Sequence, residues 1–440
     1  MDFIYLKSKF ISMSKYLNIS RASRMTWMVL LCLPSFIWSC EKSGSQPNEP
    51  KKDPIVIQLS SAENKMAQAD MGFALNLFYR ICEENRTNPS KDNILISPFS
   101  MSIALAMVWN GAAGDTKTAI QNTLGFEQYT DTEVNDYYKK MKEALLSTDP
   151  SVKLAIANSI WYRKGASINS SFVQTNKNWY DAQVLAADFS SPTAKDFINK
   201  WCSDNTNGLI NNVIDKTSAE DLIYLLNALY FKGEWSDGYE FDESKTKKGT
   251  FKRDDGTTVY PYMMTNNIKM SYFNDETLSA VSLPYGNGAF TMVFALPCEN
   301  VTTPQMIATL KQPSYWNEMQ KNWHTYQISL QVPRFKMKFN DRFNNVLKQM
   351  GMSVAFSPFS ADFSRAFDDN DFFISFVDQF TYIDVNEKGT EAVAVTVISG
   401  VDSVPVFPSA SFIADHPFVF AIKENSTGCI LFMGKVGDPS

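Results

Sequence analysis

Apolar residues recur at regular spacings along most of the chain beyond residue 60. Between Ala62 and Ile81 they return every three to four positions, which predicts an amphipathic helix. Pro98 favours the first turn of a second helix, and Asp115 is expected to cap a third helix that stops at a glycine. The predicted helices cover Ala62–Ile81, Ser100–Asn110, Asp115–Gly125 and Thr193–Asn207.

Short apolar runs between these helices predict strands. Leu222–Phe231 is apolar except for Asn227, which is typical of a strand that is covered on both faces. Strands and helices follow in irregular order without a fixed repeat, so we expect an α+β domain with several sheets. The other predicted strands are Asn93–Ser97, Leu154–Tyr162, Phe251–Met264, Ser279–Pro284, Thr291–Leu296, Ile328–Val332, Phe418–Ile422 and Ile430–Lys435.

The stretch Asn386–Ser411 combines a strand pattern with a loop pattern. One face of the strand is uniformly small, and the other is β-branched after its first residue. Gly389 precedes the strand, and a Pro/Gly-rich segment that cannot continue a central ladder follows it. Taken alone, the pattern fits an edge strand with a surface loop, or a segment able to enter a crowded sheet. The small face holds Thr390, Ala392, Ala394 and Thr396; the other holds Glu391, Val393, Val395 and Val397.

Composition excludes several classes of function. The formal net charge is −6 and no basic stripe is present, so no nucleic-acid partner is predicted. The six cysteines form no CxxC pair and there are two histidines, so we expect no metal and no other cofactor. The chain lacks the motifs GxSxG and HExxH and the phosphate-binding P-loop, and offers little imidazole for a Ser–His pair. We therefore expect a protein that is not an enzyme.

The N-terminus has the pattern of a secretory signal peptide. Basic residues precede an apolar run from Trp27 to Trp38 that is too short to span a bilayer. Cleavage after Ser39 would define a signal peptide over residues 1–39 and leave Cys40 first, in a sequence that resembles a bacterial lipobox except for the bulky Trp38. Lipidation of Cys40 would anchor the protein to the cell envelope or surface of a bacterium. The alternatives are a plain signal peptide with secretion, or a start at Met13.

The segment after the signal peptide is polar. Residues 41–54 are rich in Ser, Gly, Asn, Pro and Lys, which is typical of a solvated tether. We therefore predict a linker over residues 40–58 and a folded domain over residues 59–440.

Several sequence blocks resemble the serpins in the order in which that family carries them. They are NILISPFSMSIALAMVWNGAAGDTKTAIQNTLGF (Asn93–Phe126), FINKWCSDNTNGLI (Phe197–Ile210), LLNALYFKGEW (Leu225–Trp235), VPRFKMKF (Val332–Phe339), EKGTEAVAVT (Glu387–Thr396), FIADHPFVFAI (Phe412–Ile422) and GCILFMGKVGDP (Gly428–Pro439). The resemblance covers the chain from about residue 60 onward. It implies the serpin fold, with three β-sheets, about nine helices and an exposed reactive-centre loop.

The resemblance also implies a function, namely inhibition of endopeptidases by a suicide-substrate mechanism. In that mechanism a protease cleaves a bait bond in the loop and forms an acyl-enzyme, and the hinge then inserts into the central sheet and traps it. Family spacing from Gly389 puts the bait bond between Ser403 and Val404, which favours elastase-like or subtilisin-like serine proteases, with papain-like cysteine proteases as a further option. The hinge comprises Glu387, Gly389, Thr390, Glu391, Ala392, Val393, Ala394, Val395 and Thr396.

The resemblance implies two further functional sites, the shutter and the breach. Beneath a sheet that must open, the family carries a polar cluster, the shutter, whose members satisfy one another in more than one arrangement. Its fourth member, usually histidine, is glutamine here, and a tryptophan marks the breach where insertion begins. The matching residues are Ser97, Ser100, Asn227 and Gln379 for the shutter and Trp235 for the breach.

Two alternatives stay open. A non-inhibitory serpin that acts as a carrier or chaperone usually has bulky, charged or proline residues in its hinge, and this hinge has small ones facing inward. A cofactor of the heparin type would need a basic patch. The one dense basic group also fits a solvated turn, and it comprises Lys245, Lys247, Lys248, Lys252 and Arg253. We expect a monomer whose partners are target proteases, with membrane contact through the lipid anchor alone.

Overall fold

The computed structural model describes residues 53–88, 91–206, 208, 214–369, 371–390 and 407–440. Contacts divide the chain into two units, and all described residues belong to the second unit, Lys51–Ser440. The predicted signal peptide, Cys40 and most of the linker therefore lie outside the described residues, as does the segment 391–406.

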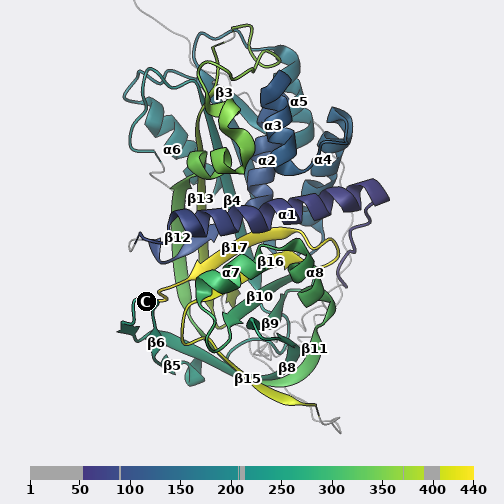
Figure 1. Cartoon of the computed structure of the whole chain (residues 1–440), viewed down its shortest axis with the longest axis vertical. Coiled ribbons are helices and arrows are strands. Elements are labelled where there is room, and N and C mark those ends of the chain that lie inside the picture. The colour runs from purple at the N-terminus through teal and green to yellow at the C-terminus, as the bar shows by residue number, and fades with distance from the viewer. Residues whose placement is uncertain (1–52, 89–90, 207, 209–213, 370, 391–406) are drawn as a thin grey trace, which may run out of the picture. The chain divides into compact units, whose positions relative to one another are not determined.

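Nine α-helices occur in the described part of the chain (Figure 1). Capping boxes start three of them, since Ser60 pairs with Glu63, Thr130 with Glu133, and Thr302 with Gln305. None of the described helices is long and apolar enough to span a bilayer. The helices are α1 (Ser61–Glu84), α2 (Pro98–Trp109), α3 (Gly114–Leu124), α4 (Asp131–Ser147), α5 (Ser170–Tyr180), α6 (Ala194–Asn205), α7 (Thr303–Leu310), α8 (Pro313–Lys321) and α9 (Asn344–Leu347).

The strands form three sheets within the described residues. The nine-stranded sheet has the order β1 (Ile94–Ile96), β17 (Ile430–Val436), β16 (Phe418–Glu424), β10 (Phe290–Pro297), β9 (Leu278–Tyr285), β8 (Tyr262–Asn274), β11 (His324–Pro333) and β15 (Ser409–Ile413), with β5 (Lys247–Lys248) paired to β8. The six-stranded sheet has the order β12 (Phe335–Arg342), β13 (Ile374–Asn386), β14 (Gly389–Thr390), β4 (Ile223–Glu234), β2 (Lys153–Arg163) and β3 (Gln183–Ala187). β6 (Phe251–Lys252) and β7 (Thr258–Val259) form a hairpin.

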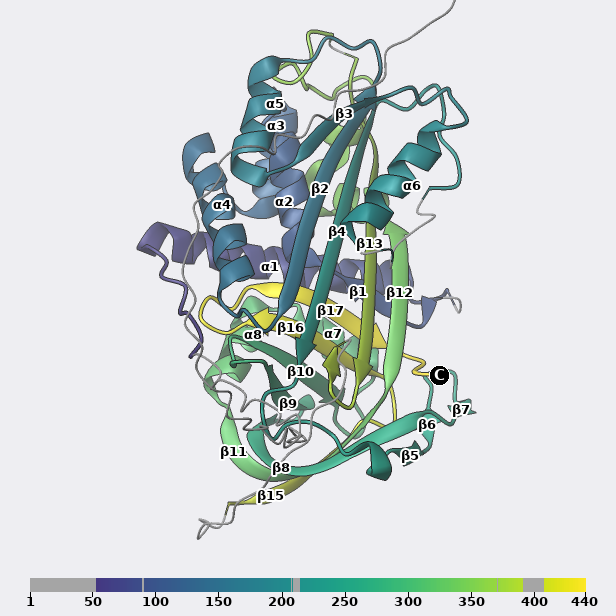
Figure 2. The same ribbon diagram turned by 180° about the vertical axis from the view of Figure 1, so that it is seen from behind.

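The six-stranded sheet is covered on both faces, as the apolar run over β4 predicts. Figure 2 shows its long strands β2, β4, β13 and β12 side by side, with α6 on the near face and α2 behind them. Ile198 and Trp201 of α6 pack with Leu226, Ala228 and Phe380 of the sheet in a separate apolar cluster. The other face belongs to the main core, which the nine-stranded sheet shares.

Two details differ from the sequence-based expectations. The strand expected over Phe251–Met264 is broken into β6, β7 and the start of β8, because residues 253–257 turn back on themselves and Gly256 has a φ of 84°. Asp115 does not cap α3, since the helix already starts at Gly114 and Asp115 lies in its first turn. The helices α4, α5, α7, α8 and α9 and the strands β3, β5, β12, β13 and β15 were also not predicted.

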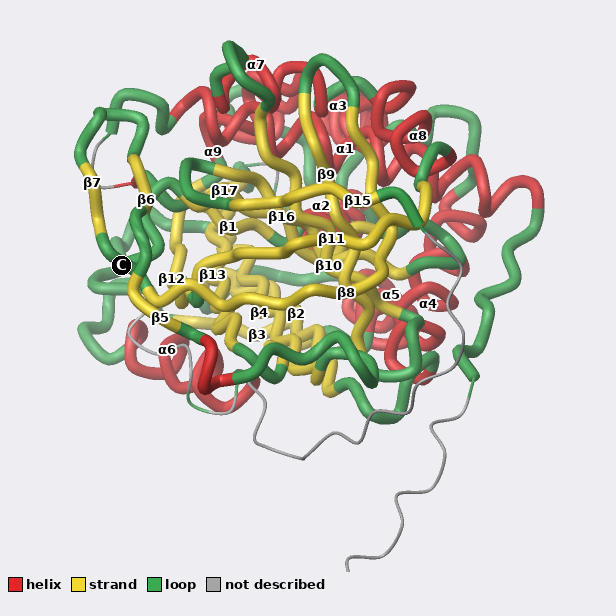
Figure 3. Tube along the Cα trace, turned by 90° about the horizontal axis from the view of Figure 1, so that it is seen from below, coloured by secondary structure: helices red, strands yellow, loops and turns green. Residues whose placement is uncertain are grey.

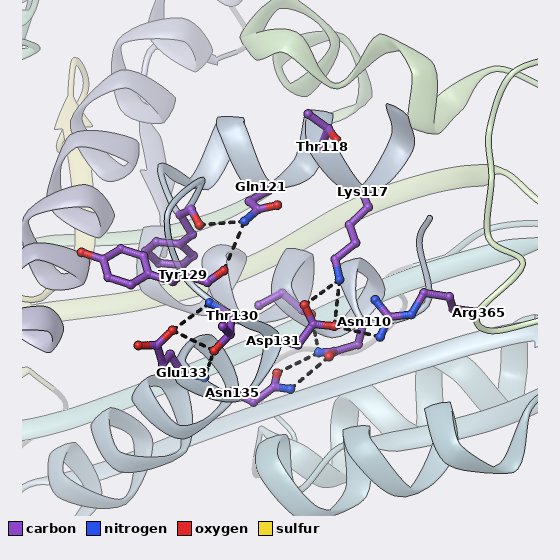
Figure 4. Close-up of polar contacts among 12 residues, drawn as sticks. Asn110, Lys117, Thr118, Gln121, Tyr129, Thr130, Asp131, Glu133, Asn135 and Arg365 are labelled. Carbon is purple, nitrogen blue, oxygen red and sulfur yellow. Dashed lines mark hydrogen bonds and ion pairs between the residues drawn. The ribbon is translucent and has the colours of Figure 1, made fainter. Parts of the chain in front are cut away.

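Polar contacts join the helices on the side of the sheet away from α6 (Figure 4). Asp131, at the start of α4, accepts from the Nζ atom of Lys117 at 2.6 Å and from Arg365 at 2.8 Å. Burial acts to raise the pKa of Asp131, but these hydrogen bonds hold it below its ordinary value. Asn110 and Asn135 exchange two amide hydrogen bonds of 2.9 and 3.0 Å.

A buried carboxyl group ties α1 to α4. Asp70 of α1 accepts hydrogen bonds from the hydroxyl groups of Tyr137 at 2.7 Å and Tyr138 at 3.0 Å. Burial raises the pKa of Asp70 to about 6, although the two tyrosine hydroxyls oppose the shift. The folded protein therefore binds this proton more tightly than the unfolded chain, in which an aspartate has a pKa of about 3.9.

The first prediction concerns pH. Protonation of Asp70 stabilises the fold below pH 4, and this contribution is lost as the pH rises through about 6. Relative to wild type, Asp70→Asn should gain on the order of 3 kcal/mol in free energy of unfolding between pH 4 and pH 8. Urea-unfolding midpoints across this pH range measure it. The exposed control Asp136→Asn should show no such trend, and a flat difference for Asp70→Asn would refute the assignment.

Candidate functional site

The start of the predicted hinge already lies inside the six-stranded sheet. β14 pairs antiparallel with both neighbours: Thr390 lies opposite Val385 of β13 and Gly233 of β4. Gly389 has a φ of 145°, and a Cβ atom there would lie 2.2 Å from the carbonyl oxygen of Gly233. Only glycine fits this position, because a side chain would push the hinge out of the sheet.

The hydroxyl group of Thr390 forms a hydrogen bond with a residue of the nine-stranded sheet. Its Oγ1 atom lies 2.8 Å from the hydroxyl oxygen of Tyr285 at the end of β9, and both side chains are buried. The ring of Trp235 stacks on that of Tyr285 with centroids 4.5 Å apart, and its Nε1 atom donates to the carbonyl oxygen of Asn386 at 3.1 Å. The predicted breach residue therefore contacts both the hinge and the tyrosine that holds it.

Two ion pairs flank the hinge. Arg334, between β11 and β12, donates to the carboxylate of Glu387, whose side chain is only 3% exposed. Burial acts to raise the pKa of Glu387, but the hydrogen bond from Arg334 holds it below its ordinary value. Lys388 lies 3.7 Å from the carboxylate of Glu243. These contacts fix the residues that immediately precede Gly389.

The predicted shutter residues come together beneath the junction of β13 and β4. The Nε2 atom of Gln379 donates to the carbonyl oxygen of Ser97 at 2.8 Å and to Oδ1 of Asn227 at 3.0 Å. Its Oε1 atom accepts from the backbone N–H of Ser97 at 2.8 Å. Asn227 in turn donates to Ser100 and, at 2.5 Å, to Oδ1 of Asn158. The glutamine bridges β13, β4 and the start of α2, because an amide both donates and accepts.

Not every polar atom in this cluster has a hydrogen-bond partner. The hydroxyl oxygen of Ser97 and the Nδ2 atom of Asn158 are buried and have no hydrogen-bond partner among the described residues. An unpaired buried polar atom costs about 1–3 kcal/mol. A different arrangement of the strands that gave these two atoms hydrogen-bond partners would therefore gain free energy.

The other predicted site residues are less informative. Glu391 to Thr396, the bond between Ser403 and Val404, and Cys40 lie outside the described residues. In the basic group, Lys245 pairs with Asp242 at 3.4 Å, and Arg253 pairs with Asp438. Among the described residues, no group of three or more His, Cys, Asp or Glu side chains is arranged to hold a metal ion.

Sequence reasoning missed three residues that contact the site, namely Asn158, Tyr285 and Arg334. Asn158 gave a usable signal, because it interrupts an apolar strand just as Asn227 does, and the two lie opposite each other in the sheet. Tyr285 and Arg334 are ordinary in sequence, and only the fold brings them to the hinge.

The described start of the hinge, the breach tryptophan and the polar cluster all lie along the contact between β13 and β4. Comparisons with known proteins show the family to which the chain belongs. A family model described as serpin (serine protease inhibitor) matches residues 68–439. Human leukocyte elastase inhibitor is 30% identical over 386 residues, which cover 85% of this chain and 100% of that protein.

Two further relatives have the same degree of identity. An uncharacterized serpin-like protein of Methanosarcina acetivorans is 30% identical over 386 residues, which cover 86% of this chain and 88% of the relative. The crystal structure of tengpin, a thermophilic serpin, in the native state has a TM-score of 0.78 and 30% identity, and the match covers 88% of this chain and 97% of tengpin. The chain belongs to the serpin family. The expected fold, with nine helices and three sheets in the described residues, is confirmed.

The second prediction concerns Gln379. Replacing it with leucine leaves the N–H group of Ser97 and the Oδ1 atom of Asn227 without their partner. The carbonyl oxygen of Ser97 loses one hydrogen bond and keeps the one from the N–H group of Met101. We expect Gln379→Leu to lower the free energy of unfolding by about 2–4 kcal/mol. Urea unfolding followed by tryptophan fluorescence measures this.

The control for this experiment is Gln379→His, which restores the residue usual in the family. Histidine can also donate and accept, so it should retain most of the wild-type stability. If the leucine variant unfolds at the wild-type midpoint, the cluster does not hold the sheet closed.

Proposed function

We propose that this serpin inhibits endopeptidases by trapping them after they cleave the segment beyond β14. The observation that carries the proposal is the position of Gly389 and Thr390, which form a strand between β13 and β4 and pair with both. The name of the family model and the name of leukocyte elastase inhibitor support inhibition as the broad function.

The register of β14 gives a path for insertion. Farther along, β13 and β4 pair directly and in parallel, from Phe376 opposite Tyr224 to Thr381 opposite Leu229. In this stretch, paired residues of β13 and β4 differ in number by the same amount as Val385 and Gly233 do. Val385 and Gly233 are the two residues that lie opposite Thr390. An inserting segment would therefore separate β13 and β4 without sliding one strand along the other.

Extending this register would bring the hinge to the polar cluster. Each further residue of the segment moves one residue back along both neighbours, so Thr396 would come to lie between Asn227 and Gln379. These two side chains are hydrogen-bonded at 3.0 Å, and separation of the strands would break that bond. The hydroxyl group of Thr396 can donate and accept, so it would supply a replacement partner at the level where one is lost.

The same register predicts which face of the sheet each of the remaining hinge side chains would occupy. Ala392 and Ala394 would face the main core with Thr390, where their small size avoids the 1–3 kcal/mol cost of overpacking, an order-of-magnitude figure. Val395 would lie beside Ala228 and Phe380, which are buried under α6. The outward face is therefore not open to solvent at this level, and a valine there would add buried apolar surface.

Counted along β4, Ser403 would reach the level of Glu220, just beyond the first residue of that strand. An acyl-enzyme on Ser403 would thus be carried the full length of the sheet. Because the bait region offers no Arg or Lys, we propose elastase-like or subtilisin-like serine proteases as targets, with papain-like proteases as a further option.

We also propose export of a monomeric protein, with Cys40 lipidated and residues 40–58 acting as a tether to a bacterial envelope. A carrier or chaperone role is the alternative. It has less support, because Gly389 and Thr390 are small, uncharged and already seated in the sheet.

The third prediction tests the trap directly. Incubation of the purified domain with elastase-like, subtilisin-like, trypsin-like and papain-like proteases should give a covalent complex of summed mass with at least one non-tryptic enzyme. Denaturing gels and intact-mass analysis would detect it, together with a released peptide that starts at Val404. Cleavage without a complex and without a gain in thermal stability would favour the carrier or chaperone.

The fourth prediction separates insertion from cleavage. In Thr390→Arg, a charge would have to stay buried beside Tyr285 for the hinge to remain in the sheet and lead the following segment in, at a cost of several kcal/mol, an order-of-magnitude figure. We expect this variant to be cleaved as a substrate, with little covalent complex on gels. The control Glu391→Arg places the same guanidinium group at the next position, which is predicted to face outward, and should still trap. Equal trapping by both variants would contradict the proposed path.

A further inference from the structure

A cavity of about 870 Å³ lies between β5 and the start of β8 on one side and the start of β12 and the end of β13 on the other. Figure 3 shows β5, β12 and β13 on the same side of the domain as the C-terminus. The volume is in the range of small-molecule sites in proteins, about 300–1,000 Å³. We call it the tyrosine cavity after Tyr260 and Tyr262, which line it.

The two tyrosines give the cavity an exposed aromatic surface. Four large aromatic side chains are exposed among the described residues, and Tyr260 and Tyr262 are two of them, at 63% and 50%. Lys248 and Arg334 lie over the ring of Tyr262. Within the described part of the chain, no ring or cation stacks on Tyr260. A flat aromatic ligand in the cavity therefore has the open ring of Tyr260 to stack on.

The lining also has one cationic side chain that no carboxylate of the described residues neutralises. Lys248 is this cation, and its Nζ atom lies 6.0 Å from the centroid of the Tyr262 ring, its neighbour across the strand pair. An unpaired cation at a cavity wall favours an anionic group on the ligand. The other three cations have carboxylate partners, in the pairs Arg334–Glu387, Lys336–Asp384 at 3.1 Å and Lys388–Glu243 at 3.7 Å.

Arg334 can bind the same anion as Lys248. Its Cζ atom lies 5.6 Å from the centroid of the Tyr262 ring, so both cations border one ring. A guanidinium group has five N–H donors, and the contact with Glu387 is made by the Nη2 atom. The side chain of Arg334 is 44% exposed, which leaves donors available to a carboxylate in the cavity. Glu387 can keep its partner while a ligand binds.

We propose that the tyrosine cavity binds a small molecule that carries an aromatic ring and one carboxylate. The carboxylate would bind Lys248 and Arg334, and the ring would stack on Tyr260. None of these three residues belongs to the segment beyond β14 that would insert into the sheet. The site is therefore separate from the proposed trap, and binding can be measured without a protease.

The fifth prediction uses 2-naphthoate, which has a naphthalene ring and one carboxylate. We expect saturable binding with a Kd of about 1 mM or below, measured by equilibrium dialysis. The uncharged 2-naphthalenemethanol and the non-aromatic cyclohexanecarboxylate should each bind at least about fivefold more weakly, because each lacks one of the two contacts. The affinity for 2-naphthoate should also fall as NaCl is raised from 50 to 500 mM, since salt screens the charge pairing.

Two variants test the residues that would make the contacts. Lys248→Gln removes the unpaired cation and Tyr260→Ala removes the open ring; each should weaken binding of 2-naphthoate about fivefold. Both side chains are exposed, so equal urea-unfolding midpoints for the variants and wild type should show an intact fold. The matched control is Lys247→Gln, which removes the same charge from the other residue of β5, outside the lining, and should bind as wild type.

The outcomes separate this site from the inhibitor. Absence of saturable binding overturns the site. Equal weakening by Lys248→Gln and Lys247→Gln also overturns it, because the attraction would then belong to the surface charge in general. Weakening by Lys248→Gln and Tyr260→Ala, with Lys247→Gln unchanged, supports the site. Failure of the wild-type protein to trap any protease overturns the inhibitor and leaves the binding result as it stands.

Discussion

The wedge of β14 between β13 and β4 is the constraint on which the rest of the site depends. At this end of the sheet the two long strands are held apart by Gly389 and Thr390, and farther along they pair with each other in parallel. A strand inserted between them would replace one parallel ladder with two antiparallel ones, and antiparallel pairing is slightly more stable per residue. Under the proposed mechanism, the present arrangement would therefore have a lower-energy alternative.

What opposes insertion is a set of contacts at two levels of the sheet. At the entrance, the Arg334–Glu387 ion pair and the Tyr285–Thr390 hydrogen bond tie the hinge to groups outside the six-stranded sheet. Deeper in, Gln379 joins β13 to β4 and to the start of α2. The entrance contacts keep the first two residues seated, and the deeper cluster stops the strands from parting. Under the proposed mechanism, these contacts would keep the sheet closed until cleavage frees the segment beyond β14.

The sequence by itself determined the class of fold, and it predicted the hinge. The alternation from Thr390 to Thr396, the glycine before it and the single asparagine in an apolar strand are local patterns, and local patterns predict strand faces and burial. The tertiary structure decided what those residues meet. Tyr285, Arg334 and Asn158 are distant from the hinge in sequence, and the level that places Thr396 between Asn227 and Gln379 follows from strand register.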